Sequence, residues 1–567
     1  MNKVTLLICL FLTSIGIQLL FFDSKYKENE KQRKYEWKND PLRSQSQRLN
    51  KDKHLRNRMD IKARKDIVVV KQCKDANTAA SALFSTLMLD SLDRLFKIGD
   101  KIRVLVELFD SYGKRKTIGG DHLRARIWNV EFSLSAPGTV FDNTNGSYMI
   151  IFECFWGGPS QISVSIAYTR EGVSALFRLM TRVLAMVNIE ARYEHENETE
   201  DALCHPDVNH LNVHTHYKEI CNFTLLNSGL PWFCGKPENK NINCKDWKYS
   251  RHTYQDNTYL LNQCEQDVLK SKQNTSTYCT KCFNTILMLL LYFHRSHQTI
   301  QQTINVTIQE TTKNNQVERI SCLEYNTTNL WFLKQTTGYL QNLTWHTTHC
   351  KGFFQEDLGD CMRNKTLYLF GDSTVRQWYS AIKSRINCKH LTKTNPKLTA
   401  AECIVKNKNF TMFLAPHCYP FYISKDQWKY ALDYLTSIAR RINQIPPFED
   451  AIVLVHIFAH MKTFHYKNFK EKISNIRHAI ETLLERNKQV KVFIKMPHTF
   501  TNNIAGINDF FESKFSEIIF EVFEGLFNKV IPLDQKDATN AAMSKFLHPP
   551  NFIADAMVNQ MFSYICE

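Results

Sequence analysis

The stretch that most constrains the fold runs from residue 365 to residue 383 and reads KTLYLFGDSTVRQWYSAIK. It opens with a short apolar run at 367–370, which predicts a buried strand, and its later apolar residues recur at helical spacing. Gly371, Asp372 and Ser373 therefore lie at a turn between a strand and a helix. Such a turn exposes a serine hydroxyl, and the first N–H groups of the helix can face an oxyanion. The pattern favours Ser373 as a nucleophile.

A Gly-Asp-Ser tripeptide taken alone is more often a helix cap, because Asp and Ser are common capping residues. The surrounding pattern decides between the two interpretations. Apolar strand patterns at 451–457, 490–494 and 530–533 alternate with amphipathic helix patterns, which predicts a mostly parallel sheet covered by helices. Reactive groups in such sheets collect beyond the carboxyl ends of the strands. His460 and Asp534 follow two of these strands, so we expect them to approach the serine.

A nucleophilic serine needs a base, and a histidine of near-neutral pKa is the usual one. His548 lies in the loop Phe546-Leu-His-Pro-Pro550, after the last predicted strand and before a terminal helix pattern. A lone loop histidine is more often simply solvated, but the Gly-Asp-Ser block upstream reverses that preference. We predict that His548 is the general base.

The N-terminal half has a different periodicity. Polar and apolar residues alternate in Lys101–Leu108 and again in Gln161–Tyr168. Alternation with a period of two buries one face of a strand and predicts an antiparallel β-sandwich. Glycine- and asparagine-rich turns separate these runs.

Residues 4–22 form an apolar run that could span a bilayer, and no clear cleavage site follows it. An uncleaved signal-anchor is slightly favoured over a signal peptide. The net charge of +16 is concentrated in a basic tract between residues 25 and 71, which reads as a solvated stem, and no nucleic-acid-binding module accompanies it. We therefore expect no nucleic-acid partner, and membrane contact only through the N-terminal segment.

Cysteines and glycosylation signals both indicate the secretory pathway. Sixteen of the 17 cysteines lie outside the apolar run, and disulfides are favoured over zinc for the Cys279-Thr-Lys-Cys282 pair. No metal site is predicted. We expect a Golgi-lumenal type II protein or a secreted one. The predicted glycosylation sites are Asn145, Asn197, Asn222, Asn274, Asn305, Asn326, Asn342, Asn364 and Asn409.

Two regions resemble known families. GDSTVRQW and the His-Pro-Pro at 548–550 resemble the PC-esterase branch of the SGNH (GDSL-like) acyl hydrolases and acyltransferases. VELFDSYGKRKTIGGDHLRARIWN and NGSYMIIFECFWGGPSQISVSIAYTREGVSALFR are similar to neurexophilin-like sequences. Together they resemble the neurexophilin and PC-esterase (NXPE) family.

The resemblance implies an immunoglobulin-like sandwich followed by a three-layer α/β SGNH-like domain. It implies that Ser373 and His548 are catalytic and that Gly371, Asp372 and His460 belong to the turn and oxyanion region. The SGNH acid usually stands three residues before the histidine, where this chain has Lys545, so Asp534 and Asp537 are the alternatives. Phe458 replaces an expected glycine beside His460, and losing one oxyanion donor costs about 3 kcal/mol.

Two classes of function remain open. The resemblance implies a serine acyl-esterase or O-acyltransferase acting on O-acylated surface glycans such as sialic acids, with acetyl-CoA as a conceivable donor and no bound cofactor. The alternative is a catalytically reduced binding protein that contacts a receptor or glycan through the sandwich. The predicted organisation is a signal peptide or signal-anchor at 1–22, a basic stem at 23–75, a neurexophilin-like sandwich at 76–200, a Cys-rich connecting region at 201–330 and an SGNH-like domain at 331–567.

Overall fold

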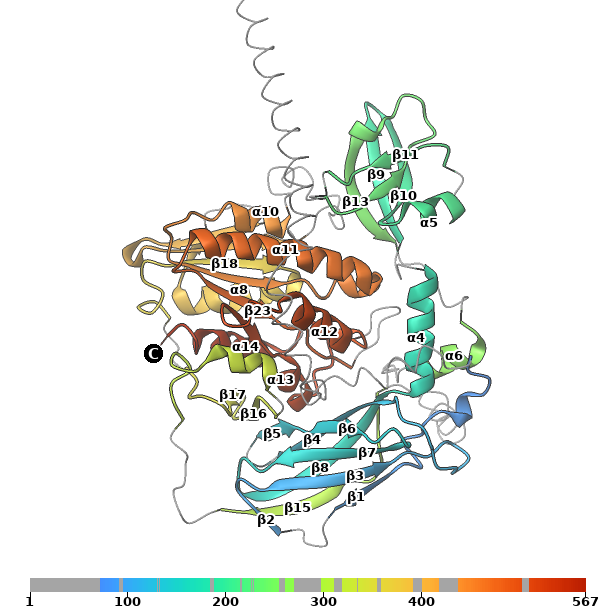
Figure 1. Ribbon diagram of the computed structural model, residues 1–567, viewed down its shortest axis with the longest axis vertical. Helices are drawn as coiled ribbons and strands as arrows, with labels where there is room; N and C mark the ends of the chain where they lie inside the picture. Colours follow the sequence, from blue (N-terminus) through green and yellow to red (C-terminus); the bar gives the residue numbers. More distant parts are fainter. Residues whose placement is uncertain are drawn as a thin grey trace, which may run out of the picture. The chain divides into compact units, whose positions relative to one another are not determined.

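The structure is a computed structural model, and it shows a multidomain, β-rich protein with antiparallel and mixed sheets (Figure 1). It describes residues 72–566 except 91–94, 130, 132, 184–187, 215–216, 226, 228, 254–260, 270–296, 311–318, 334, 354–357, 391–399, 418–436 and 502–508. The predicted signal segment, nearly all of the stem, Asn274 and the Cys279–Cys282 pair lie outside the described residues. Within them, no helix is both long and apolar enough to cross a bilayer.

Two sheets of the N-terminal half pack around one apolar core. The alternation predicted for β3 and β8 is confirmed, because every second side chain of each strand is buried. One sheet has the order β1 (Thr86–Leu89), β3 (Lys101–Glu107), β7 (Ser147–Glu153) and β6 (Thr139–Asp142). The other has the order β17 (Thr344–Thr347), β16 (Gly338–Gln341), β5 (Leu134–Pro137), β4 (His122–Asn129), β8 (Gly158–Tyr168), β15 (Ile304–Gln309) and β2 (Leu95–Lys97), with β14 (Gln298–Thr299) paired to β8.

The second of these sheets draws on distant parts of the chain. Strands β14 and β15 pair with β8, and the hairpin β16–β17 joins the same sheet through β5. Residues that the sequence places in the connecting region and at the start of the C-terminal domain thus complete a sheet of the N-terminal half.

A third sheet belongs to the cysteine-rich region. Its order is β11 (Ile220–Asn222), β12 (Phe233–Gly235), β10 (Glu198–His205), β9 (Asn188–His195) and β13 (Trp247–Thr253). Disulfides 204–234 and 221–244 tie it together, and residue 200 lies inside the β9–β10 hairpin. The helices of this half are α4 (Arg170–Val183), α5 (Val208–His214) and α6 (Gln263–Leu269).

The fourth sheet carries the site. Its order is β19 (Lys389–His390), β20 (Ala401–Val405), β21 (Phe410–Pro416), β18 (Thr366–Gly371), β22 (Ala451–His456), β23 (Lys491–Lys495) and β24 (Val530–Leu533). The five strands from β21 to β24 are parallel, as the sequence predicted for most of the sheet. Strand β22 is buried along its whole length, which is expected for a strand covered on both faces.

Helices cover both faces of this sheet, shown yellow to red in Figure 1. One core contains α8 (Ser373–Ile386), α13 (Lys536–Ala541) and α14 (Asn551–Phe562). The other contains α10 (Ile438–Asn443), α11 (Tyr466–Arg486) and α12 (Glu512–Val522). The carboxyl ends of β18, β21, β22 and β23 therefore meet at one edge, and Asp372, His417, His456 and Lys495 lie there.

Candidate active site

A serine and a histidine from distant parts of the chain meet at this edge. Ser373 is the first residue of α8, and His548 lies in the loop before α14. The Ser373 Oγ and His548 Nε2 atoms are 2.7 Å apart, although 175 positions separate the residues. Ser373 is half-buried and His548 is exposed, so a solute can reach the pair. This is hydrogen-bonding distance for a nucleophile and its base.

The turn before the serine requires glycine. A Cβ atom on Gly371 would lie 2.3 Å from the carbonyl oxygen of His456 and 2.6 Å from Val375 Cγ2. Strand β18 therefore approaches β22 more closely than any side chain allows. Glycine is needed here because it lets two backbones approach closely.

Asp372 is the N-cap of α8, and its carboxylate is fully buried. It accepts hydrogen bonds from Thr374 N at 2.9 Å and from Thr374 Oγ1 at 2.7 Å. It also accepts from the backbone N–H groups of Phe458 at 3.2 Å and Ala459 at 2.7 Å. One carboxylate thus joins the nucleophile turn to the loop that follows β22.

This arrangement changes the predicted oxyanion region. The two amides after β22 donate to Asp372, so they are directed at a protein carboxylate rather than at a substrate. The His460 ring packs against the His417 ring with the centroids 4.9 Å apart and the ring planes tilted by 41°. The backbone N–H of Ser373 lies at the first position of α8, where helix geometry leaves N–H groups without an intrahelical acceptor.

The structure does not bring either candidate acid to the base. The Asp534 carboxylate accepts from Lys536 N at 2.9 Å, and the Asp537 carboxylate accepts from Thr337 N at 2.8 Å and Thr337 Oγ1 at 2.9 Å. Among the described residues, the one hydrogen bond of His548 is the bond with Ser373. Lys545, at the usual SGNH acid position, is exposed.

The electrostatic setting keeps His548 neutral. Although the residue is solvent-accessible, partial desolvation of its imidazole lowers the pKa of His548 below its ordinary value. The Asp372 carboxylate acts to raise this pKa, and the cations Arg376, Lys495 and Lys462 act to lower it. A neutral imidazole at pH 7 can accept the proton of a serine hydroxyl. Burial would raise the pKa of Asp372, but the cationic surroundings, including Lys495, hold that pKa well below its usual range. Asp372 is therefore a carboxylate.

Buried basic residues at the same edge were not singled out by sequence reasoning. Lys495 is 1% exposed, and burial lowers its pKa to about 8. Lys462 is 2% exposed, and burial lowers its pKa to about 7. His456 and His498 are also buried, and both have lowered pKa values. His456 and Lys495 lie within one residue of the ends of the predicted strands 451–457 and 490–494, so the strand-end rule that selected His460 and Asp534 could have found them.

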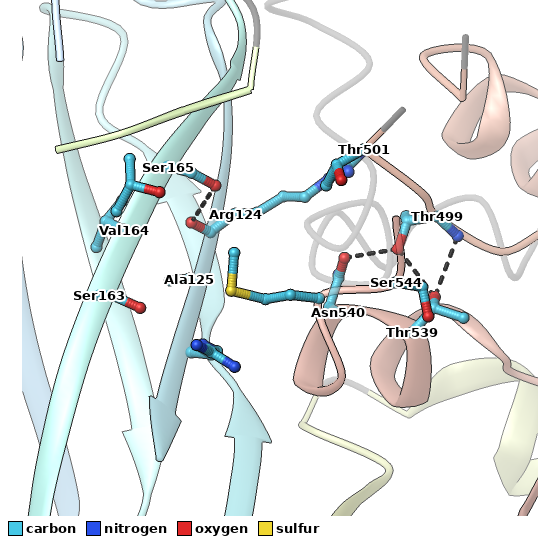
Figure 2. A pocket seen from close by; sticks show the side chains of 13 residues that line it. Arg124, Ala125, Ser163, Val164, Ser165, Thr499, Thr501, Thr539, Asn540 and Ser544 are labelled. Carbon is cyan, nitrogen blue, oxygen red and sulfur yellow. Dashed lines mark hydrogen bonds between the residues drawn. The ribbon is translucent and has the colours of Figure 1, made fainter. Parts of the chain in front are cut away.

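A separate cavity lies away from the serine, between strands β4 and β8 and the segment around helix α13 (Figure 2). Arg124, Ser165, Thr499 and Asn540 are among the residues that line it. Its volume of about 20 Å³ has room for roughly one water molecule. Beside it, Arg124 and Tyr168 bind the buried carboxylate of Asp509, which joins a strand of the N-terminal half to the C-terminal domain. Within the described residues there is no His/Cys/Asp/Glu group suited to a metal ion.

The surface and the cysteines fit a secreted protein. Eight of the nine predicted glycosylation asparagines lie within the described residues, and all eight are exposed. Cys154 is buried and has no disulfide partner among the described residues. The part of the chain that the structure describes contains six disulfides: 73–264, 204–234, 221–244, 322–350, 361–566 and 388–403.

The fold and the site define a disulfide-bonded, multidomain protein of the secretory pathway or the extracellular space, with a serine–histidine pair in its C-terminal α/β domain. Residues 62–281 match the family model of neurexophilin, and residues 345–566 match that of the NXPE family member 4-like C-terminal domain. The chain belongs to the NXPE family.

Proposed function

We propose that the C-terminal domain is an SGNH-like serine acyl-esterase or O-acyltransferase that acts on O-acylated glycans of the cell surface. The observation that carries this proposal is the 2.7 Å contact between Ser373 Oγ and His548 Nε2 at the carboxyl edge of a parallel sheet. The half-buried position of Ser373 at the start of a 14-residue helix supports it, because the helix N-terminus favours developing negative charge.

In the proposed reaction, His548 Nε2 takes the proton of Ser373 Oγ as the oxygen attacks the carbonyl carbon of an ester or thioester. The Ser373 N–H can donate to the oxygen that becomes negative. The bond from the carbonyl carbon to the leaving oxygen or sulfur then breaks, and His548 returns the proton to the leaving group. Water or a sugar hydroxyl, deprotonated by the same imidazole, then attacks the carbonyl carbon of the acyl-serine. The bond between that carbon and Ser373 Oγ breaks, His548 returns the proton to Oγ, and the acyl group leaves as the free acid or as the sugar ester.

The family resemblance extends the proposal to the substrate. O-acetyl groups on sialic acids and related surface carbohydrates are the proposed acyl groups, with acetyl-CoA as the proposed donor for transfer. The N-terminal half, as an immunoglobulin-like neurexophilin-type sandwich, is proposed to contact the glycoprotein or receptor that carries the glycan.

A second function is favoured by one observation. The amides of Phe458 and Ala459 donate to Asp372, and His548 has no carboxylate partner among the described residues. A site with fewer oxyanion donors and no orienting acid suits a protein that binds a glycan or receptor without turning it over.

Covalent labelling separates the two functions. The full chain would be treated with a fluorophosphonate probe, alongside Ser373→Ala and the control Ser384→Ala, which changes an exposed serine near the end of the same helix. Enzyme function predicts that the wild type and Ser384→Ala are labelled and that Ser373→Ala is not. Equal labelling of all three chains, or no labelling with glycan binding retained, contradicts the enzyme proposal.

A further inference from the structure

The loop that carries His548 is held by its backbone on both sides. His498 Nε2 lies 2.8 Å from the carbonyl oxygen of Leu547. Gln377 Nε2, on helix α8, lies 2.6 Å from the carbonyl oxygen of Pro549. His548 thus stands between two anchored carbonyl groups, although its own ring bonds to Ser373 alone among the described residues.

The protonation of His498 follows from its neighbours. A carbonyl oxygen can only accept, so the Nε2 atom that faces Leu547 carries the proton. The Nδ1 atom is then an acceptor, and it faces the ammonium nitrogen of Lys495 at 3.4 Å. His498 is 0% exposed, and its pKa is well below the ordinary value, because of its burial and the neighbouring Lys495. Lys495 and Leu547 therefore select one neutral tautomer.

Lys495 makes a similar contact on the other side of the site. Its ammonium group lies 3.2 Å from His456 Nε2 and 3.2 Å from Thr374 Oγ1. The Nδ1 atom of His456 faces the Lys495 carbonyl oxygen at 2.7 Å, so Nε2 is its acceptor. With His498, the three protons of the ammonium have three acceptors. Thr374 in turn donates to Asp372, which caps the helix of the serine.

We propose that Lys495 and His498 are positioning residues that fix the nucleophile turn and the base loop relative to each other. In a three-residue triad, a carboxylate bonded to the base has this role. The path runs from the turn of Ser373 through Thr374 to Lys495, and through His498 to the backbone beside His548. This inference rests on the proposed function, because the relative position of Ser373 and His548 matters only if the two side chains react together.

A purely structural role does not explain why Lys495, His456 and His498 are buried together at this position. Buried ammonium and imidazole groups are costly to desolvate, and an apolar cluster of the same volume is often at least as stable. The cluster lies directly beneath the serine and histidine, at the edge where parallel sheets collect functional groups. Its contacts reach both reacting loops.

The test uses two amide variants that differ by one methylene. In His498→Gln, the amide can still accept from Lys495 and donate to the Leu547 carbonyl. In His498→Asn, the shorter side chain keeps the contact with Lys495 but does not reach Leu547. Lys495→Met removes the donor to all three acceptors. His349→Phe is the control, because it removes the 2.7 Å contact that a partly buried histidine away from the site makes with Tyr564.

Two measurements are made on the full chain. The first is the rate constant for fluorophosphonate labelling of Ser373. We expect His498→Asn and Lys495→Met to label about 10- to 100-fold more slowly, as for a misplaced reacting group, and His498→Gln and His349→Phe to stay within about threefold of the wild type. The second is hydrogen exchange of the backbone amides of residues 545–548, which we expect to be faster in His498→Asn than in His498→Gln.

The positioning role would be overturned if His498→Asn were labelled at the wild-type rate. It would also be overturned if the labelling rate fell equally in His498→Asn and His498→Gln. If the wild type does not label at all, the proposed function fails, and hydrogen exchange alone decides the inference. Faster exchange confined to His498→Asn then supports the anchoring of the base loop, whereas identical exchange in the two amide variants refutes it. If Lys495→Met is not secreted, the pair of amide variants still gives the answer.

Discussion

Lys462 allows a sharp test of the electrostatics around the site. It belongs to the short helix Met461–Thr463 after β22, and its ammonium group lies 4.2 Å from the centre of the Phe500 ring. The side chain is 2% exposed, and its nitrogen has no hydrogen-bond acceptor among the described residues. Replacing it with methionine keeps most of the volume and removes the charge without leaving an acceptor unsatisfied. We therefore expect Lys462→Met to be more stable than the wild type.

The magnitude follows from the pKa. Burial lowers the pKa of Lys462 from 10.5 to about 7, and each pKa unit corresponds to about 1.4 kcal/mol. The charged lysine therefore destabilises the fold by about 5 kcal/mol at pH 6. Between pH 7 and 10.5 the unfolded chain binds more protons than the folded chain, so wild-type stability rises with pH in that window. The advantage of Lys462→Met should shrink by about 3 kcal/mol between pH 6 and pH 9.5.

The assay is thermal unfolding of both chains at the two pH values. For a domain of this size, 3 kcal/mol corresponds to a change of about 6–12 °C in the difference between their Tm values. Lys495→Met is the control, because its three acceptors lose their donor and no stabilisation is expected at pH 6. A Lys462→Met chain that melts no higher than the wild type at pH 6, or a gap that does not change with pH, refutes the reasoning.

Three further predictions concern the turn, the base and the domain contact. Gly371→Ala forces a Cβ atom to within 2.3 Å of a backbone oxygen and should lower stability by about 2 kcal/mol or more, so a Tm close to that of the wild type would contradict the packing argument. The labelling rate of Ser373 should rise with pH as His548 loses its proton, with a midpoint below the ordinary histidine value of 6.5 because the pKa of His548 is lowered, and a midpoint at or above 6.5 would contradict this. Arg124→Met leaves the buried Asp509 carboxylate without its cation and should lower the stability measured by thermal unfolding by about 3–5 kcal/mol. The same change at Arg126, on the same strand, should lower the stability less, and equal losses in the two variants would contradict a stabilising role of the ion pair.

The local parts of the site could be predicted from the sequence. The apolar run at 367–370, followed by Gly-Asp-Ser and helical spacing, indicates the strand, the turn and the helix of the serine. The apolar segments at 451–457 and 490–494 predict two strands of a mostly parallel sheet, and the structure has them as the parallel neighbours β22 and β23. These signals are local because side-chain periodicity and turn chemistry act over a few residues.

The partners of the reactive groups could not be predicted in this way. Asp534 and Asp537 are close to the base in sequence order, but the Asp534 carboxylate accepts from the backbone of Lys536 and the Asp537 carboxylate accepts from Thr337. Sequence reasoning did not select Lys495, which ends strand β23. Only the fold shows that its ammonium group contacts Thr374, 121 positions away.

The amino-acid order determined which segments are strands, helices and turns, where a reactive serine can be exposed, and that cysteines and glycosylation signals belong to the secretory route. Only the tertiary structure decided what surrounds that serine: the histidine 2.7 Å away, the amides turned toward Asp372 and the buried lysine between two imidazoles. The physical reason is that hydrogen bonds and desolvation depend on distances between atoms, and strand pairing brings together residues that the chain separates widely.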